Sequence, residues 1–315
     1  LNTKEKVRTT DTAMYALITN PEYKMPTVLP DGHYRAKQFE VEAANRETAG
    51  RREEGLSEHF RMEAAPTLRP DFEIIGLDML NGVLDRKIMV FGIPVFTYAG
   101  VAEQDFVRTA HVLAQWLDND EDGEVDNRLV LGALAEHNSY VFIVENQGQV
   151  NTYNFQNGTR AFSVDAESIQ RRWYTTGPSG DPDGTMEEPF HMISDAGYGK
   201  VYPEIFATQR GTVIANAMDI ARGGYFARTP DVYPDDAWYT NPTKGCRYGC
   251  MVGEYFYWSM TSTLGVNVNR GEHIKDQWKL YTPELVEQRD KTMFGLLTDP
   301  KYRFATKYPD GVYGD

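Results

Sequence analysis

The apolar positions along the chain predict strands and helices between residues 71 and 315. The apolar run 88–101, interrupted by two glycines and a proline, is typical of a buried strand pair. The predicted strands are 72–76, 87–98 and 140–146, and the predicted helices are 104–117, 127–136, 212–222 and 254–264. This mixture predicts a single main domain of the α+β or α/β class. The polar stretch 147–186 is expected to form long surface loops.

The two ends of the chain carry the same motif. Residues 1–34 align without a gap on residues 280–313, with 15 identities in 34 positions, where average residue usage gives about 2 by chance. In the first copy the identical residues are Leu1, Thr3, Glu5, Val7, Asp11, Met14, Leu17, Thr19, Pro21, Tyr23, Thr27, Pro30, Asp31, Gly32 and Tyr34. Each copy predicts a short helix, capped by Asp11 or Asp290, followed by a turn.

This repeat suggests how the chain is organised. We expect an N-terminal copy of the motif at 1–35, a charged linker or exposed helix at 36–70 and a main domain at 71–315. The first copy looks like the tail of a preceding unit. It can pack on the same molecule or dock on a neighbouring chain, and the second arrangement would give a homo-oligomer by head-to-tail assembly.

Composition narrows the range of partners. The chain has 46 acidic and 32 basic residues, a net charge of −14, which disfavours nucleic acid and attracts cations. No apolar run approaches the roughly 20 residues that span a bilayer. Because the sequence shows neither a signal peptide nor an initiator methionine, we expect a processed or trimmed form.

The two cysteines and one sequon bear on localisation. Cys246 and Cys250 have three residues between them and no second pair, which favours a short-loop disulfide over a metal knuckle, with two free thiols as the alternative. Asn157 begins an Asn-Gly-Thr glycosylation sequon. The disulfide, the sequon and the acidity together favour a secreted, extracellular protein, which would be a glycoprotein if Asn157 is modified.

An acidic loop follows the first predicted helix. Asp118, Asp120, Asp122 and Asp126 occupy positions 1, 3, 5 and 9, and Gly123 occupies position 6. Over about nine residues this resembles the calcium loops of the EF-hand family. The resemblance implies calcium ligands, which are Asp118, Asp120, Asp122, Glu124 and Asp126. The family's closing glutamate is replaced by Leu129, so the site would be weak and structural; the alternative is a solvated acidic turn.

A second candidate metal site lies in residues 186–193. On a helix, Glu187 and His191 would lie one turn apart with Glu188 beside them. The segment resembles a degenerate form of the HExxH motif of zincin metallopeptidases, with Glu187 in place of the first histidine. The resemblance implies a zincin-like scaffold that binds zinc or another divalent cation through Glu187, His191 and Glu254, with Glu188 as general base.

Two features count against efficient peptidase activity in that segment. The first histidine of the motif is missing, and Pro189 lies inside it, where proline is tolerated only in a first helical turn. Glu254 is expected to open a later helix. The alternative for His191 is a hydrogen-bonded histidine at a helix start.

Three functions follow from these patterns. The first is a secreted calcium-binding protein on a zincin-like scaffold, acting by binding or assembly and without efficient peptidase activity. The second is an active zinc metallopeptidase that uses Glu187, His191 and Glu254 as ligands and Glu188 as base. The third is an extracellular structural protein that assembles through the duplicated motif. The aromatic run 255–258 is expected to form a core helix face. The alternative is that some of the 19 tyrosines line a groove for a peptide or glycan ligand.

Overall fold

The main domain begins with a sheet whose strands follow the apolar runs of the sequence. A computed structural model describes residues 70–80, 84–97, 100–145, 161–165 and 184–314, all within one compact unit, Leu56–Asp315. The expectations for residues 1–35, for 36–69 and for glycosylation at Asn157 lie outside these residues. The chain folds as an α+β domain.

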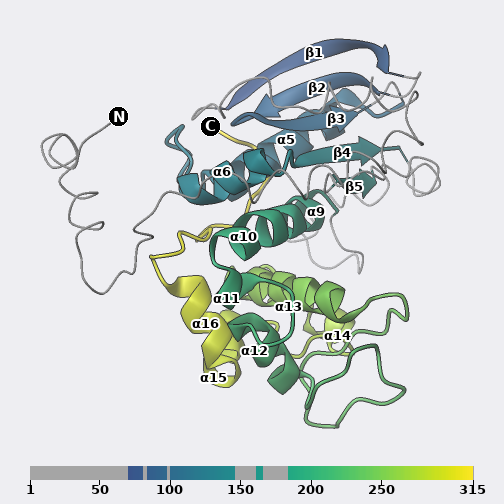
Figure 1. The fold of residues 1–315 in the computed structure, drawn as a ribbon, viewed down its shortest axis with the longest axis vertical. Coiled ribbons are helices and arrows are strands. Elements are labelled where there is room, and N and C mark those ends of the chain that lie inside the picture. The colour runs from purple at the N-terminus through teal and green to yellow at the C-terminus, as the bar shows by residue number, and fades with distance from the viewer. Residues whose placement is uncertain (1–69, 81–83, 98–99, 146–160, 166–183, 315) are drawn as a thin grey trace, which may run out of the picture. The chain divides into compact units, whose positions relative to one another are not determined.

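Five strands form one sheet in chain order (Figure 1). The first three are antiparallel and the last two run parallel to β3. The strands are β1 (Asp71–Leu80), β2 (Leu84–Val90), β3 (Ile93–Thr97), β4 (Tyr140–Val144) and β5 (Ala161–Asp165). The expected strand pair is confirmed as β2 and β3, which a turn at Phe91 and Gly92 connects.

Helices build the rest of the domain. α5 (Glu103–Leu117) packs on β2 and β3, and α6 (Arg128–Glu136) follows after the acidic loop. α9 (Gly184–Met192) contacts β4, β5 and α5 on one side and α13 (Tyr248–Thr263) on the other, so it joins the sheet to the helical layer (Figure 1). The remaining elements are η2 (Ile193–Tyr198, a π-helix), α10 (Gly199–Val201), α11 (Pro203–Phe206), α12 (Val213–Ala221), α14 (Gly271–Ile274), α15 (Pro283–Arg289) and α16 (Lys291–Thr298).

Two expectations about these elements were wrong. Strand β5 lies within the stretch 147–186 that was expected to form loops, because pairing with β4 gives this short segment a place in the sheet. Helix α13 begins at Tyr248, so Glu254 lies inside it instead of opening it. Gly249 and Gly253 lower the intrinsic helix preference there, but they face Thr208 and His191, where a small residue lets α13 pack closely.

The C-terminal segment, residues 299–314, leaves α16 and returns to α5 and the acidic loop, where the chain ends beside the sheet layer (Figure 1). Its Tyr302 and Phe304 are buried against Tyr198 and Phe206. This segment therefore joins the helical layer to the region around the acidic loop. No helix among the described residues is long and apolar enough to cross a membrane.

Candidate metal sites

Helix α9 carries three of the predicted site residues. Glu187 and His191 are one turn apart, and Glu188 lies between them in the chain. Pro189 lies in the second turn of α9, so the expectation that it must lie in the first turn was wrong. Proline there lacks the N–H that would bond to the carbonyl four residues earlier. A π-helix follows directly at Ile193, a feature often found beside functional sites.

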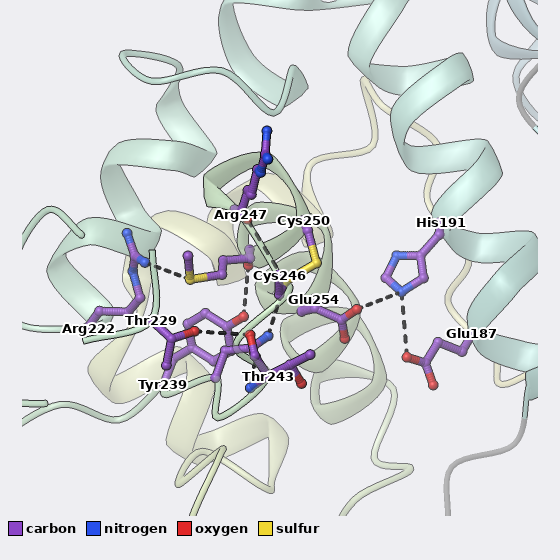
Figure 2. The surroundings of a disulfide bond; sticks show 12 residues. Glu187, His191, Arg222, Thr229, Tyr239, Thr243, Cys246, Arg247, Cys250 and Glu254 are labelled. Carbon is purple, nitrogen blue, oxygen red and sulfur yellow. Dashed lines mark hydrogen bonds and ion pairs between the residues drawn. A yellow bond between two sulfur atoms is a disulfide. The ribbon is translucent and has the colours of Figure 1, made fainter. Parts of the chain in front are cut away.

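Helix α13 supplies the third residue of what we call the helix cluster: Glu187, His191 and Glu254. His191 Nε2 lies 3.6 Å from a Glu187 carboxylate oxygen and 3.5 Å from a Glu254 carboxylate oxygen, and the three candidate ligand atoms all lie within 4.8 Å of one another. Figure 2 shows both carboxylates pointing at the same ring nitrogen. A Cβ added at Gly253 would contact the His191 ring at 3.5 Å, so the glycine keeps the two helices close.

The side chains of the helix cluster are partly buried. The side chains of His191, Glu187 and Glu254 are 13%, 20% and 28% exposed, whereas the Nε2 atom itself is buried. Nε2 has no hydrogen-bond partner among the described residues, because both carboxylate distances exceed a normal N–H···O bond. A buried nitrogen that faces two carboxylates across such gaps suits a cation placed between them.

Burial and charge shift the protonation of these groups. Burial raises the pKa of Glu188 and of Glu254 to about 7, although the nearby His191 acts to lower both. Burial lowers the pKa of His191, but the surrounding carboxylates of Glu187, Glu254 and Glu188 outweigh it and raise the pKa to about 9. Without a metal ion, His191 is therefore an imidazolium held between two carboxyl groups.

The donor set fits a small divalent ion. One imidazole and two carboxylates suit zinc and other transition metals. Ligands about 2.0–2.2 Å from a tetrahedral zinc ion lie about 3.3–3.6 Å from one another. The two distances from His191 Nε2, 3.6 Å and 3.5 Å, match that spacing.

A disulfide lies one turn before Glu254. Cys246 and Cys250 are bonded, with their Cα atoms 5.4 Å apart, which confirms the predicted short-loop bridge (Figure 2). Cys250 is in the first turn of α13, four residues before Glu254. The bridge thus ties the start of this helix to the preceding loop.

The acidic loop, residues 118–126, lies between α5 and α6 as predicted. Candidate ligand atoms of Asp118, Asp120 and Asp122 lie within 4.8 Å of one another. Gly123 has φ +88°, the left-handed conformation expected at position 6, and its N–H donates to Asp118 Oδ2 at 2.9 Å. Asp118 is fully buried, and its Oδ1 has no hydrogen-bond partner among the described residues.

Two other predicted calcium ligands have different partners. Glu124 pairs with Arg128 at 2.9 Å on the surface, and Asp126 accepts the Asn119 N–H at 2.8 Å. Leu129, at the closing position, is 65% exposed and adds no ligand. A cavity of about 490 Å³ borders the loop, and Asp120, Asp122 and Arg303 contribute to its wall. Burial raises the pKa of both Asp118 and Asp126. In the absence of a cation, burial therefore disfavours the charged form of each carboxyl group.

No local pattern in the sequence indicates that the C-terminal segment reaches the acidic loop. Asn119 is central: its Oδ1 accepts the N–H groups of Thr306 and Lys307 at 2.8 and 2.9 Å, and its Nδ2 donates to the Lys307 carbonyl at 2.9 Å. The Tyr313 hydroxyl donates to Asp118 Oδ2. The duplicated motif was the available signal for this contact. Residues that are repeated in both copies but lie outside the predicted helix indicate contacts with another surface.

Comparison of the chain with protein-family models, with curated proteins and with solved structures gave no match. The resemblances to EF-hand loops and to zincin motifs therefore stay predictions that rest on the residues themselves.

Proposed function

We propose that this protein binds one divalent transition-metal ion in the helix cluster and uses Glu188 as a general base in a hydrolytic reaction. The observation that carries the proposal is the approach of Glu254 to His191. These residues are 63 positions apart in the chain, yet their side-chain atoms lie 3.5 Å apart with Glu187 on the other side.

The chain's own residues fit this role. A divalent ion would lower the pKa of a water molecule bound to it to about 7. Glu188 lies next to a ligand on α9, and burial raises the pKa of its carboxyl group to about 7, the range in which a carboxylate can take up and release a proton. The side chains of Glu187 and Glu254 are partly exposed, which suits a site that exchanges water and substrate with solvent. The zincin resemblance points to an amide substrate, such as a peptide.

The experiment uses the full chain, stripped with a chelator and reloaded with zinc, manganese or cobalt. We expect about one equivalent bound per chain and cleavage of a peptide mixture that chelator abolishes. Glu188→Gln should keep the metal and lose cleavage, whereas His191→Gln should lose both. Metal binding without any cleavage would reject the hydrolase and retain the metal centre; absence of binding would reject both.

A calcium ion in the acidic loop is the second candidate, because Asp118 Oδ1 is buried and unpartnered beside two further carboxylates. We propose that this ion is structural and weakly bound, since no described residue closes the loop as the EF-hand glutamate does. Extracellular calcium and the Cys246–Cys250 bridge both suit a secreted protein, which is the localisation we propose. A rise in melting temperature on calcium addition, absent in Asp118→Asn, tests this site.

A further inference from the structure

The second copy of the duplicated motif, residues 280–313, uses its identical positions to build and dock itself. Its buried apolar side chains include Val286, Met293, Tyr302 and Pro309. All four have identical counterparts in the first copy, which are Val7, Met14, Tyr23 and Pro30. The buried positions that differ, Leu297, Phe304 and Ala305, are Ile18, Met25 and Pro26 in the first copy and stay apolar.

The polar docking contacts follow the same rule. Asp290 caps α16 and accepts hydrogen bonds from Tyr255 at 2.5 Å and from Trp238 at 3.4 Å. Asp290 is buried where it contacts α13, and it corresponds to Asp11 in the first copy. A cap alone needs no tyrosine or tryptophan partner, so this identity also preserves a contact with the rest of the domain.

The end of the motif docks on α5. Gln115 Nε2 donates to Asp310 Oδ1 at 2.9 Å, and Gln115 Oε1 accepts the Gly311 N–H at 2.8 Å. Gly311 has φ +81°, and a Cβ there would collide with Arg108. The Tyr313 hydroxyl bonds to Asp118. The three docking residues correspond to Asp31, Gly32 and Tyr34.

The positions that differ between the copies lie mostly on the outside. Glu287, Gln288, Lys291, Lys301 and Lys307 are exposed. Their counterparts are Arg8, Thr9, Thr12, Glu22 and Val28, which change the charge at four of the five positions, all except Gln288. Most buried positions of the motif are therefore identical in the two copies, and most positions that differ are exposed or half-buried, although identical residues such as Glu284 and Thr298 are exposed as well.

We infer that residues 1–34 are a docking segment for a second copy of this domain, in which they take the place that residues 280–313 occupy in this one. The acceptor surface consists of Trp238 and Tyr255 for the helical part and of Gln115, Asp118 and Asn119 for the end of the motif. The described part of the chain offers one such surface, and residues 280–313 fill it. The matching surface for residues 1–34 is therefore that of a second copy of this domain.

Docking in this form is an exchange. The C-terminal copy is attached to its own acceptor, so its high effective concentration makes it the stronger competitor. Weakening its final contacts should therefore open the acceptor to residues 1–34 of a second chain. Assembly through such an exchange joins chains head to tail.

The test compares full-length chains by light scattering over a wide concentration range in chelator. The opened variant is D310A with Y313A. We expect it to form concentration-dependent dimers and larger species, and the further changes D31A and Y34A to weaken that association by about tenfold or more. Adding instead R8Q and T12Q, which alter positions whose counterparts Glu287 and Lys291 are exposed, should leave the association unchanged.

Loss of cooperative melting would show that the opened variant, D310A with Y313A, does not fold. In that case the milder variant Y313F, which removes only one hydroxyl, is used in its place. A synthetic peptide of residues 1–34, labelled at its N-terminus, gives a second measurement. It should bind the opened chain and lose about tenfold in affinity with D31A and Y34A. A folded opened chain that stays monomeric and does not bind the peptide would overturn the inference, and so would association that D31A and Y34A leave intact.

Discussion

The acidic loop and the helix cluster each bring three possible metal ligands together, but from different stretches of chain. The loop takes Asp118, Asp120 and Asp122 from five consecutive positions, whereas the cluster takes its ligands from two helices. Two of the three loop residues are exposed, while all cluster residues are half-buried. The loop is therefore suited to a weakly held, hydrated calcium ion, and the cluster to a smaller ion with defined geometry.

The difference also concerns what each site does without metal. The cluster can neutralise itself, because His191 is able to carry a proton between two carboxylates. In the loop, hydrogen bonds from Gly123 and Tyr313 meet one oxygen of Asp118 and leave the other unpartnered. Metal removal should thus affect chemistry at the cluster and stability at the loop.

The largest expected effect separates the two sites by metal affinity. His191→Gln removes the one nitrogen ligand and should weaken zinc binding by about a hundredfold or more. Calcium-induced stabilisation should be unchanged, because the loop shares no ligand with the cluster. Isothermal titration with each metal measures both effects. Equal loss of zinc and calcium binding would contradict the separation of the two sites.

The pH dependence of the metal-free protein comes next. Because the pKa of His191 is raised from 6.5 to about 9, the imidazolium contributes stability that is fully present below pH 6.5 and lost as the pH rises through about 9. The pKa of Glu254 is raised from 4.5 to about 7, so its ionisation lowers the stability of the folded protein as the pH rises from 4.5 to about 7. Urea unfolding in chelator should show the wild type losing its advantage over His191→Gln between pH 6.5 and 9. If the difference between wild type and His191→Gln stayed constant from pH 6.5 to 9, the pKa of His191 would not be raised in the folded protein.

Asn119 tests how firmly the C-terminal segment holds the acidic loop. Asn119→Ala removes the hydrogen bonds to Thr306 and Lys307 and leaves partly buried backbone groups unpaired. The free energy of unfolding should fall by about 2–3 kcal/mol. The matched control Asn216→Ala removes a single exposed hydrogen bond and should cost less than about 0.5 kcal/mol. Similar losses for the two variants would deny Asn119 its special role.

The smallest effect is that of calcium itself. Saturating calcium should raise the melting temperature by a few degrees, about 1–2 kcal/mol at the affinity expected of an open loop. Asp120→Asn should reduce that rise, whereas Glu124→Gln should not, because Glu124 faces Arg128. If Glu124→Gln abolished the rise, the loop would have to rearrange around the ion.

Local patterns predicted most of the fold and part of each site. The sequence pattern predicted helices α5, α6 and α12 and the strand pair β2–β3. In these elements the spacing of apolar residues along the chain is enough to indicate a helix or a strand. The first six residues of α13 were not predicted as helix, because Gly249 and Gly253 lower the local helix preference. The two glycines serve instead the contacts with Thr208 and His191. β5 was missed because its place in the sheet depends on pairing with β4.

The same division applies to the sites. The spacing of the acidic loop predicted which aspartates would converge, and the i, i+4 spacing placed Glu187 beside His191. Glu254 came from the resemblance to zincins and the fold brings it into place. The docking of Tyr313 on Asp118 and of Thr306 on Asn119 joins residues almost 200 positions apart, which no local pattern encodes.

The most direct test of the metal centre is an anomalous-scattering map from crystals of the full chain grown with zinc. We predict one peak within bonding distance of His191 Nε2 and of a carboxylate oxygen from each of Glu187 and Glu254. A well-ordered cluster without a peak, in which His191 forms hydrogen bonds to both carboxylates, would contradict the proposed metal centre.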